Sequence, residues 1–182
     1  MEYLDIVDDN GVPTGEIISR DEAHRKGIMH RTAHVWVIKK TDSGIEVLLQ
    51  KRSLNKESFP GMYDTSSAGH IPAGEEPLSS ALRELNEELG IAAEKNSLEY
   101  IGSFHIKYEK IFHGSLFKDN EVTSVYLYSG AVETENLELQ QSEVESVKWF
   151  DIEEVWQEIQ HNRERFCVPT EGLKILRDHL NI

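Results

Sequence analysis

One short segment constrains this chain more than any other: GHIPAGEEPLSSALRELNEELGI, residues 69–91. Pro77 suits the first turn of a helix, and Gly90 suits the position just after the last turn. Between them leucine recurs at intervals of four, three and four residues, so one face of the helix is apolar. The segment therefore predicts a helix over residues 77–89 that packs on a core through one stripe.

The same helix carries acidic residues that should repel one another. Glu84, Glu87 and Glu88 stand at i, i+3 and i+4, so they share a face. A divalent cation such as Mg²⁺ prefers oxygen ligands and would reverse this repulsion. The alternative interpretation is a solvated acidic face, the usual meaning of a run of charges. We expect Arg83 to point away from these glutamates and to hold the preceding loop by clamping a carboxylate.

The composition is that of an ordinary globular chain. Hydrophobic residues make up 38% and charged residues 29% of 182 residues, so we expect a single domain over residues 1–182. The net charge of −14 disfavours nucleic acid polymers and anionic membranes as partners, because both repel an acidic surface. Cys167 is the only cysteine, so no internal disulfide forms. With no signal peptide and no membrane-spanning run, we expect a cytoplasmic protein.

Hydrophobic patterns outline the remaining elements. They predict an N-terminal hairpin, three further helices and several strands, and therefore an α/β fold with a mixed sheet and helices on its faces. Thr170 is the expected N-cap of the last helix. Residues 112–121 (FHGSLFKDNE) are expected to form a loop that acts as a lid or substrate selector. The predicted hairpin covers residues 3–20, the strands 31–40, 45–53, 62–71, 98–109, 120–132 and 146–152, and the helices 20–27, 152–162 and 170–180.

The segment 69–91 resembles the Nudix box, G-x5-E-x7-R-E-U-x-E-E-x-G-U, where U is a bulky aliphatic residue. Every fixed position is filled. The matching residues are Gly69, Glu75, Arg83, Glu84, Leu85, Glu87, Glu88, Gly90 and Ile91. The flanking segments HRTAHVWVI, VLLQKRS and FPGMYDTSSAGHIPAGE are similar to the branch of this family that also contains isopentenyl-diphosphate isomerase. The resemblance implies a Nudix-type α/β/α sandwich with a mixed central sheet.

The resemblance also implies a reaction and a set of residues for it. The expected activity is Mg²⁺- or Mn²⁺-dependent attack of water on a diphosphate bond, in a nucleoside diphosphate linked to X or a similar organic pyrophosphate. The implied metal ligands are Glu84, Glu87 and Glu88, and the implied catalytic residues are Glu87, Glu121 and Arg83. Gly69, His70 and Glu75 would shape the loop at the substrate. The expected partner is a small-molecule diphosphate, and a homodimer is also considered because many family members dimerise.

Two other functions stay open at this point. In the isomerase a catalytic cysteine immediately precedes the Gly-His pair, whereas this chain has Ala68 there, and alanine cannot transfer a proton. A catalytically silent ligand-binding module would usually have a degraded box, whereas this box is complete. His24, His30, His70, Asp119 and Glu121 resemble the isomerase residues that bind a metal, so a second metal site or its remnant is considered. The sequence does not name the substrate, nor which glutamate is the base.

Overall fold

A mixed seven-stranded sheet organises the molecule in the computed structural model, which describes residues 1–182. The strand order is β5-β4-β3-β8-β7, with β6 paired to β3 and β9 paired to β4. The pairing of β3 with β8 is parallel and the others are antiparallel. The strands are β3 (His30–Thr41), β4 (Gly44–Arg52), β5 (Tyr63–Asp64), β6 (Ser67–His70), β7 (Leu98–Phe112), β8 (Ser115–Tyr128) and β9 (Val144–Asp151).

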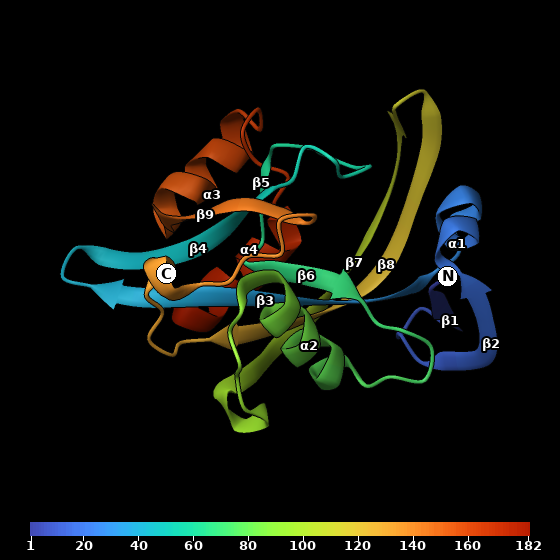
Figure 1. Ribbon diagram of the computed structural model, residues 1–182, viewed down its shortest axis with the longest axis horizontal. Helices are drawn as coiled ribbons and strands as arrows, with labels where there is room; N and C mark the ends of the chain where they lie inside the picture. The colour runs from blue at the N-terminus through green and yellow to red at the C-terminus, as the bar shows by residue number, and fades with distance from the viewer.

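Helices cover both faces of this sheet, which gives the expected α/β/α arrangement (Figure 1). Side chains alternate along β3, so Val35 and Val37 pack under α2 (Pro77–Leu89). Trp36 and Ile38 point to the opposite face, where α3 (Ile152–His161) and α4 (Thr170–Leu180) pack. Two hydrophobic cores result, one on each side of the sheet. Two short 3-10 helices, η1 (Lys95–Ser97) and η2 (Thr134–Asn136), lie in the connections.

The N-terminal segment forms a separate two-stranded sheet that is attached to the loop before α2. It consists of β1 (Tyr3–Val7) and β2 (Pro13–Ser19), followed by α1 (Arg20–Lys26). The buried Asp5 carboxylate accepts hydrogen bonds from Arg31 Nη2 and from the Gly74 N–H, both at 2.9 Å. These contacts of Asp5 with Arg31 and Gly74, here called the Asp5 latch, hold the loop before α2 against the hairpin. None of the helices combines the length and apolar character that crossing a bilayer requires.

The predicted helix over residues 77–89 is confirmed, and Gly90 ends it with a φ of 71°. The expected loop over residues 112–121 is wrong, because β7 and β8 continue as a long antiparallel arm (Figure 1). His113 and Gly114 have φ values of 50° and 80°, so they form a tight turn that keeps the flanking residues paired. Thr170 is also not the N-cap, since Pro169 holds that position and the Thr170 hydroxyl accepts a hydrogen bond from Arg163.

Candidate active site

Gly69 makes room for a glutamate of the facing helix. A Cβ atom built at this position would lie 2.2 Å from Glu84 Cδ, far inside contact distance. Any side chain here would therefore displace the carboxylate of Glu84. Burial raises the pKa of Glu84, and the neighbouring Arg83 guanidinium opposes that rise. The first glycine of the box is thus required by close packing of β6 against α2.

Glu88 is the most deeply enclosed carboxylate of α2, with 4% of its surface exposed. Its Oε2 accepts hydrogen bonds from Gln50 Nε2 at 3.0 Å and from the Ala68 N–H at 3.1 Å. Burial raises the pKa of Glu88 to about 7, although the hydrogen bond from the Ala68 N–H and the charge of Lys56 act against the rise. Two donors from two different strands therefore fix one oxygen of this carboxylate.

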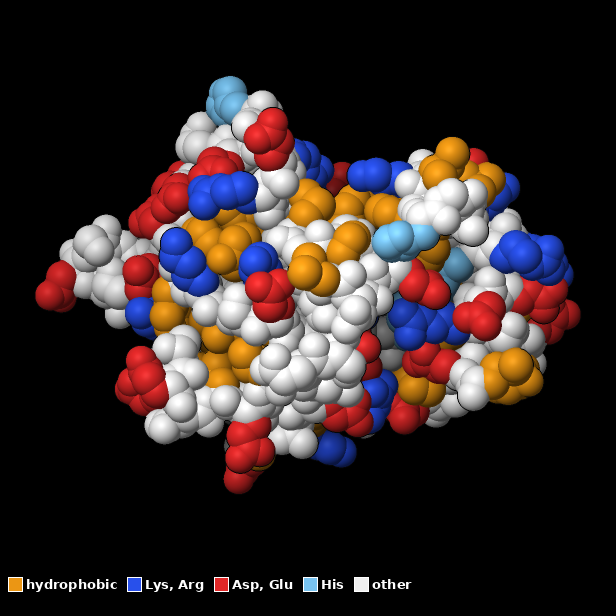
Figure 2. Space-filling model, turned by 45° about the horizontal axis from the view of Figure 1, so that its top comes forward, with side chains coloured by type: hydrophobic (Ala, Val, Ile, Leu, Met, Phe, Trp, Pro, Cys, Tyr) orange, Lys and Arg blue, Asp and Glu red, His pale blue; other side chains and the backbone are white.

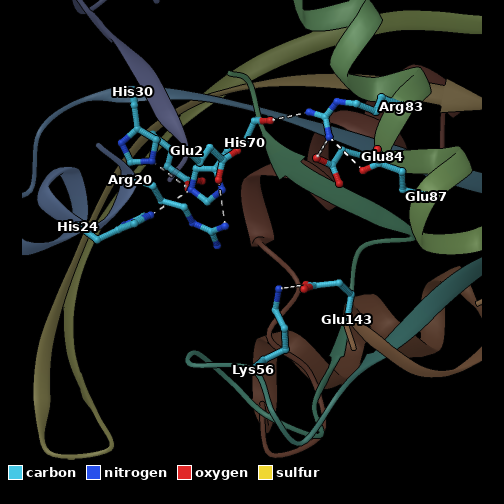
Figure 3. A network of polar contacts seen from close by, with 11 residues as sticks. Glu2, Arg20, His24, His30, Lys56, His70, Arg83, Glu84, Glu87 and Glu143 are labelled. Atoms are coloured by element: carbon cyan, nitrogen blue, oxygen red, sulfur yellow. Dashed lines mark hydrogen bonds and ion pairs between the residues drawn. The ribbon is translucent and has the colours of Figure 1, made fainter. Parts of the chain in front are cut away.

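Arg83 does not point away from the glutamates, so that expectation is wrong. Its Nη1 donates to Glu84 Oε1 at 2.7 Å and to Glu87 Oε2 at 3.2 Å (Figure 3). The i,i+4 spacing on one helix brings Arg83 over Glu87. The expected hold on the loop also exists: Nη2 donates to the His70 carbonyl at 3.4 Å, and Nε lies 3.7 Å from Glu75 Oε2. One guanidinium thus connects the loop with two box carboxylates.

A second group of side chains, here called the histidine centre, consists of His24, His30, His70 and Glu121. One ligand atom of each lies within 4.8 Å of those of the others. The Nε2 atoms of His24 and His70 are 3.0 Å apart, and Glu121 Oε1 lies 3.5 Å from His30 Nε2 and 3.6 Å from His70 Nε2. The residues come from α1, β3, β6 and β8, so tertiary structure alone assembles them.

The histidine centre has the chemistry of a metal site. The buried atoms His24 Nδ1, His30 Nε2 and Asp119 Oδ1 have no hydrogen-bond partner. Burial opposes ionisation of Glu121, yet the nearby rings of His30 and His70 hold its pKa well below the usual range. Burial and the neighbouring Glu121 raise the pKa of Asp119 to about 8. Three imidazoles and one carboxylate are ligands that suit a transition-metal ion such as Mn²⁺ or Zn²⁺.

Both groups line one cleft of about 1270 Å³. Figure 2 shows histidine, basic and acidic side chains gathered in the right-hand part of one face of the molecule. Arg20 and Lys56 also line the cleft, and each pairs with a glutamate, Arg20 with Glu2 at 3.1 Å and Lys56 with Glu143 (Figure 3). The cleft therefore offers separate cationic and anionic groups, as a bound phosphate and a metal ion would need.

The sequence-predicted site residues fall into two sets. The first set is a continuous group on β6, the loop and α2, and it comprises Gly69, His70, Glu75, Arg83, Glu84, Glu87 and Glu88. Glu121 instead joins the histidine centre, where the Thr32 hydroxyl donates to its Oε2 at 3.2 Å. Sequence reasoning missed Thr32 and Gln50, the partners of Glu121 and Glu88. Each lies within a strand, 89 and 38 residues from its partner, and no local pattern indicates such a contact.

Comparison with known proteins places these observations in a family. A family model described as the NUDIX domain matches residues 29–168. An uncharacterised Nudix hydrolase of Clostridium acetobutylicum is 42% identical over 154 residues, covering 85% of this chain and 72% of the relative. Nudix hydrolase 3 of Arabidopsis thaliana is 41% identical over 155 residues, and this match covers 84% of the chain but 20% of that longer protein. An isopentenyl-diphosphate Delta-isomerase of Serratia proteamaculans is 31% identical over 170 residues, covering 92% and 86%.

Solved structures share the same fold. A protein of Deinococcus radiodurans superimposes with a TM-score of 0.71 and 19% identity, covering 97% of this chain and 98% of that one. The NUDIX domain of NrtR from Shewanella oneidensis, solved in complex with ADP ribose, gives a TM-score of 0.59 and 17% identity, covering 90% and 99%. At such identities these likenesses show the fold alone.

Proposed function

Because this chain belongs to the Nudix hydrolase family, we propose that it splits the diphosphate bond of a nucleoside diphosphate linked to X, or of a similar organic pyrophosphate, with a divalent metal ion. The observation that carries this proposal is that Glu84, Glu87 and Glu88 all line the cleft from one face of α2, with Arg83 paired to Glu84 and Glu87. Nudix hydrolases act on pyrophosphate bonds in general and use divalent metals. The proposal for this chain therefore concerns the class of its substrate and the identity of its metal ion.

The three box carboxylates are the groups that would hold Mg²⁺ or Mn²⁺. Hard divalent cations take oxygen ligands. The position of Glu88 is fixed by two hydrogen-bond donors, and that of Glu84 by its packing against Gly69. When bound, such an ion neutralises phosphoryl charge and polarises the phosphorus–oxygen bonds. Glu87 completes the set, and Arg83 keeps it close to Glu84.

Glu87 is the proposed general base. Its side chain is 48% exposed, against 16% for Glu84, so it can reach a water molecule in the cleft. In the proposed step, the water oxygen forms a bond to one phosphorus, the bridging P–O bond breaks, and the water proton passes to the Glu87 carboxylate. The leaving phosphate takes the bond electrons, and two phosphate products result. Arg83 orients Glu87 and balances its charge.

Arg20 and Lys56 are the proposed clamps for the substrate phosphates. Each is already paired with a glutamate at the cleft, Glu2 and Glu143 respectively. Both pairs are partly exposed, so each ion pair is weak and a phosphate can replace the glutamate. This exchange would position the diphosphate between the clamps and the box carboxylates.

The histidine centre supports a second metal ion in the same cleft. Its unpartnered buried atoms fit a cation better than they fit a hydrogen-bonded core. His70 belongs to both groups, since its ring faces Glu121 and its carbonyl oxygen accepts from Arg83. We assign Glu121 to this centre, with Thr32 and His30 holding its orientation, while Glu87 serves the attacking water.

An isomerase of the isopentenyl-diphosphate type is the second candidate, favoured by the 31% identical relative and by the histidine centre. The residue at the position of the catalytic cysteine argues against it. Ala68 donates its N–H to Glu88, but its methyl side chain carries no exchangeable proton. The hydrolase therefore remains the better supported function.

The test is a product analysis by mass. The purified protein is incubated with Mg²⁺ and a panel of nucleoside diphosphate-X compounds that also includes isopentenyl diphosphate. We expect metal-dependent products whose masses sum to substrate plus water, and a fall in kcat of about 10²- to 10⁴-fold in Glu87→Gln. Glu16→Gln, an exposed glutamate on β2, is the matched control and should keep full activity. Isomerised isopentenyl diphosphate, or equal hydrolysis by Glu87→Gln, would contradict the proposal.

A further inference from the structure

His34 is a buried histidine to which the proposed reaction gives no role. It lies on β3 with 8% of its surface exposed, and its ring lines the cleft. Its Nδ1 atom is buried and has no hydrogen-bond partner. By contrast, the ring of His30 is held by the Ile28 carbonyl at 2.8 Å. A buried polar ring without a partner costs free energy, so we expect a partner from outside the chain at this position.

The strand register places His34 between the two groups of the candidate active site. Side chains two residues apart on a strand share a face, so Thr32 lies on the same side of β3, about 7 Å along the strand. Thr32 donates its hydroxyl to Glu121 of the histidine centre. On the neighbouring strand Ala68 pairs with His34, and the Ala68 N–H donates to the box carboxylate of Glu88. The imidazole is therefore one neighbour away from each group.

The neighbours of His34 close it off from the core and leave it open toward the cleft. Phe104 packs against the imidazole, with ring centroids 5.8 Å apart and an interplanar angle of 74°. Trp36, the next residue on that face of β3, is fully buried in the core under α3 and α4. Ala68 carries only a methyl group on the face that it shares with His34. A ligand in the cleft can therefore reach the ring past Ala68.

The imidazole of His34 is a neutral hydrogen-bond donor. Burial lowers its pKa, and the opposing charges of Asp64 and Glu121 do not prevent this. Buried N–H groups without an acceptor are rare, so the single proton belongs on Nε2 and not on the buried Nδ1. The Asp64 carboxylate is already held by Arg52 Nη1 at 2.9 Å and by the Thr65 N–H at 2.7 Å. The Nε2–H group is thus available to a ligand.

We propose that His34 is a specificity-determining residue, whose Nε2–H donates a hydrogen bond to an oxygen atom of the group that the substrate carries beyond its diphosphate. This inference rests on the proposed function and narrows its substrate class to organic diphosphates with a hydroxyl or carbonyl oxygen at that place. A hydrocarbon chain there would cover the N–H group and remove its hydration without offering an acceptor. A site built to bind a hydroxyl group rejects the analogue that lacks it, because its own polar group is left unpaired.

The experiment compares diphosphates that differ only in one hydroxyl group. Propyl, butyl, pentyl and hexyl diphosphate are each tested against the same chain with a hydroxyl group at its far end. Binding is measured by calorimetry with Mg²⁺ in the Glu87→Gln background, in which we expect turnover to be suppressed. At least one hydroxylated chain should bind about 10- to 100-fold more tightly than its alkyl counterpart.

His34→Leu should abolish or reverse this preference, because leucine offers an apolar contact and no donor. His34→Gln keeps an N–H donor and should retain part of it. His161→Leu is the matched control, since His161 is an exposed histidine of α3 outside the cleft, and it should keep the full preference. Melting temperatures of all variants are compared to establish folding.

Nitrogen NMR of the ring gives a second readout that leaves His34 unchanged. In the Glu87→Gln protein its Nε2 resonance should shift with the hydroxylated chain and not with the alkyl chain. Equal affinities within every pair, a preference that persists in His34→Leu, an Nε2 resonance that does not shift, or no binding of any hydroxylated chain would overturn the role of His34. Because these readouts concern binding, a failure of the product analysis contradicts the proposed reaction only.

Discussion

Individual box residues differ more in their surroundings than their shared helix face suggests. Glu88 is buried and held by two donors, Glu84 is packed against a glycine, and Glu87 is half exposed. Arg83 offsets part of the repulsion, because its guanidinium lies between Glu84 and Glu87. Glu88 has no such cationic partner on α2. Its pKa is raised by burial, so its negative charge is unfavourable without a bound cation.

Gly69→Ala should abolish most of the hydrolase activity without unfolding the protein. The added methyl group would overlap Glu84 Cδ, so the carboxylate must leave its position. We expect a loss of about 10- to 100-fold in kcat, the range seen when metal-ligand support is removed. Steady-state kinetics would measure it, and the double variant Gly69→Ala/Glu84→Asp should recover part of the loss because aspartate is shorter. Wild-type kcat in Gly69→Ala would contradict the role given to this glycine.

Glu88→Gln should stabilise the metal-free protein at alkaline pH. The pKa of Glu88 is about 7 in the folded state and near 4.5 when unfolded, so its ionisation destabilises the fold as pH rises through this interval. Above pH 7 the neutral amide should add about 1–3 kcal/mol to the free energy of unfolding, and at pH 4 the gain should vanish. Glutamine still offers one oxygen to the donors of Gln50 and Ala68.

Denaturant unfolding in EDTA at pH 4 and pH 8 measures this effect. With Mg²⁺ at pH 8 the ranking should reverse, because the ion stabilises the carboxylate and not the amide. A variant less stable than wild type at pH 8 in EDTA would show that Glu88 is not penalised by burial.

Among the elements, the N-terminal hairpin fixes the loop that leads into α2. Asp5 on β1 bonds both Arg31 on β3 and the Gly74 N–H in the loop, and the Ala73 N–H donates to the Tyr3 carbonyl at 2.8 Å. Arg31 also donates to the Glu75 carbonyl at 3.1 Å. The hairpin, β3 and the loop therefore meet at one buried ion pair, and the position of the box depends on it.

Asp5→Ala should lower the free energy of unfolding by about 3 kcal/mol, because it leaves the buried Arg31 guanidinium without its carboxylate partner. This corresponds to a fall in melting temperature of roughly 6–12 °C for a chain of this size. Asp5→Asn keeps one acceptor oxygen and should lose less. Thermal unfolding followed by circular dichroism provides the measurement, and equal melting temperatures for wild type and Asp5→Ala would exclude the latch.

For the whole molecule, cation binding should be linked to stability, because the box carboxylates and the histidine centre both line one cleft of an acidic chain. The net charge is −14, so the fold carries appreciable self-repulsion that bound cations reduce. A metal ion that binds only the folded state stabilises it in proportion to the logarithm of its concentration.

Mn²⁺ at about 100 times its Kd should raise the free energy of unfolding by about 2.7 kcal/mol relative to protein in EDTA. His24→Asn should reduce this gain in the free energy of unfolding, because it removes one ligand of the histidine centre. The share of the gain that comes from metal bound at the box carboxylates should remain. Differential scanning calorimetry with stepped Mn²⁺ concentrations gives the comparison. A melting temperature independent of both Mn²⁺ and EDTA would rule out a metal centre in either group.

The sequence by itself determined the helix over residues 77–89, its apolar stripe and the shared face of Glu84, Glu87 and Glu88. These features depend on the 3.6-residue period and on residues close in the chain, so they can be read locally. It also indicated His24, His30, His70, Asp119 and Glu121 as candidates, but only through resemblance. The outer part of the β7–β8 arm was expected to be a loop. The turn residues His113 and Gly114 favour an irregular segment when they are read locally, and the pairing of the strands on either side of them does not show in the sequence.

The tertiary structure alone decided which of those candidates meet. The parallel pairing of β3 with β8 sets His30 opposite Glu121, and the antiparallel pairing of β3 with β6 brings His70 opposite Thr32. A shift of one residue in either register would turn one of these side chains to the other face of the sheet. Contacts between residues 46 or 91 positions apart, such as His24 with His70 and Thr32 with Thr123, depend on that register, which core packing on both faces of the sheet selects.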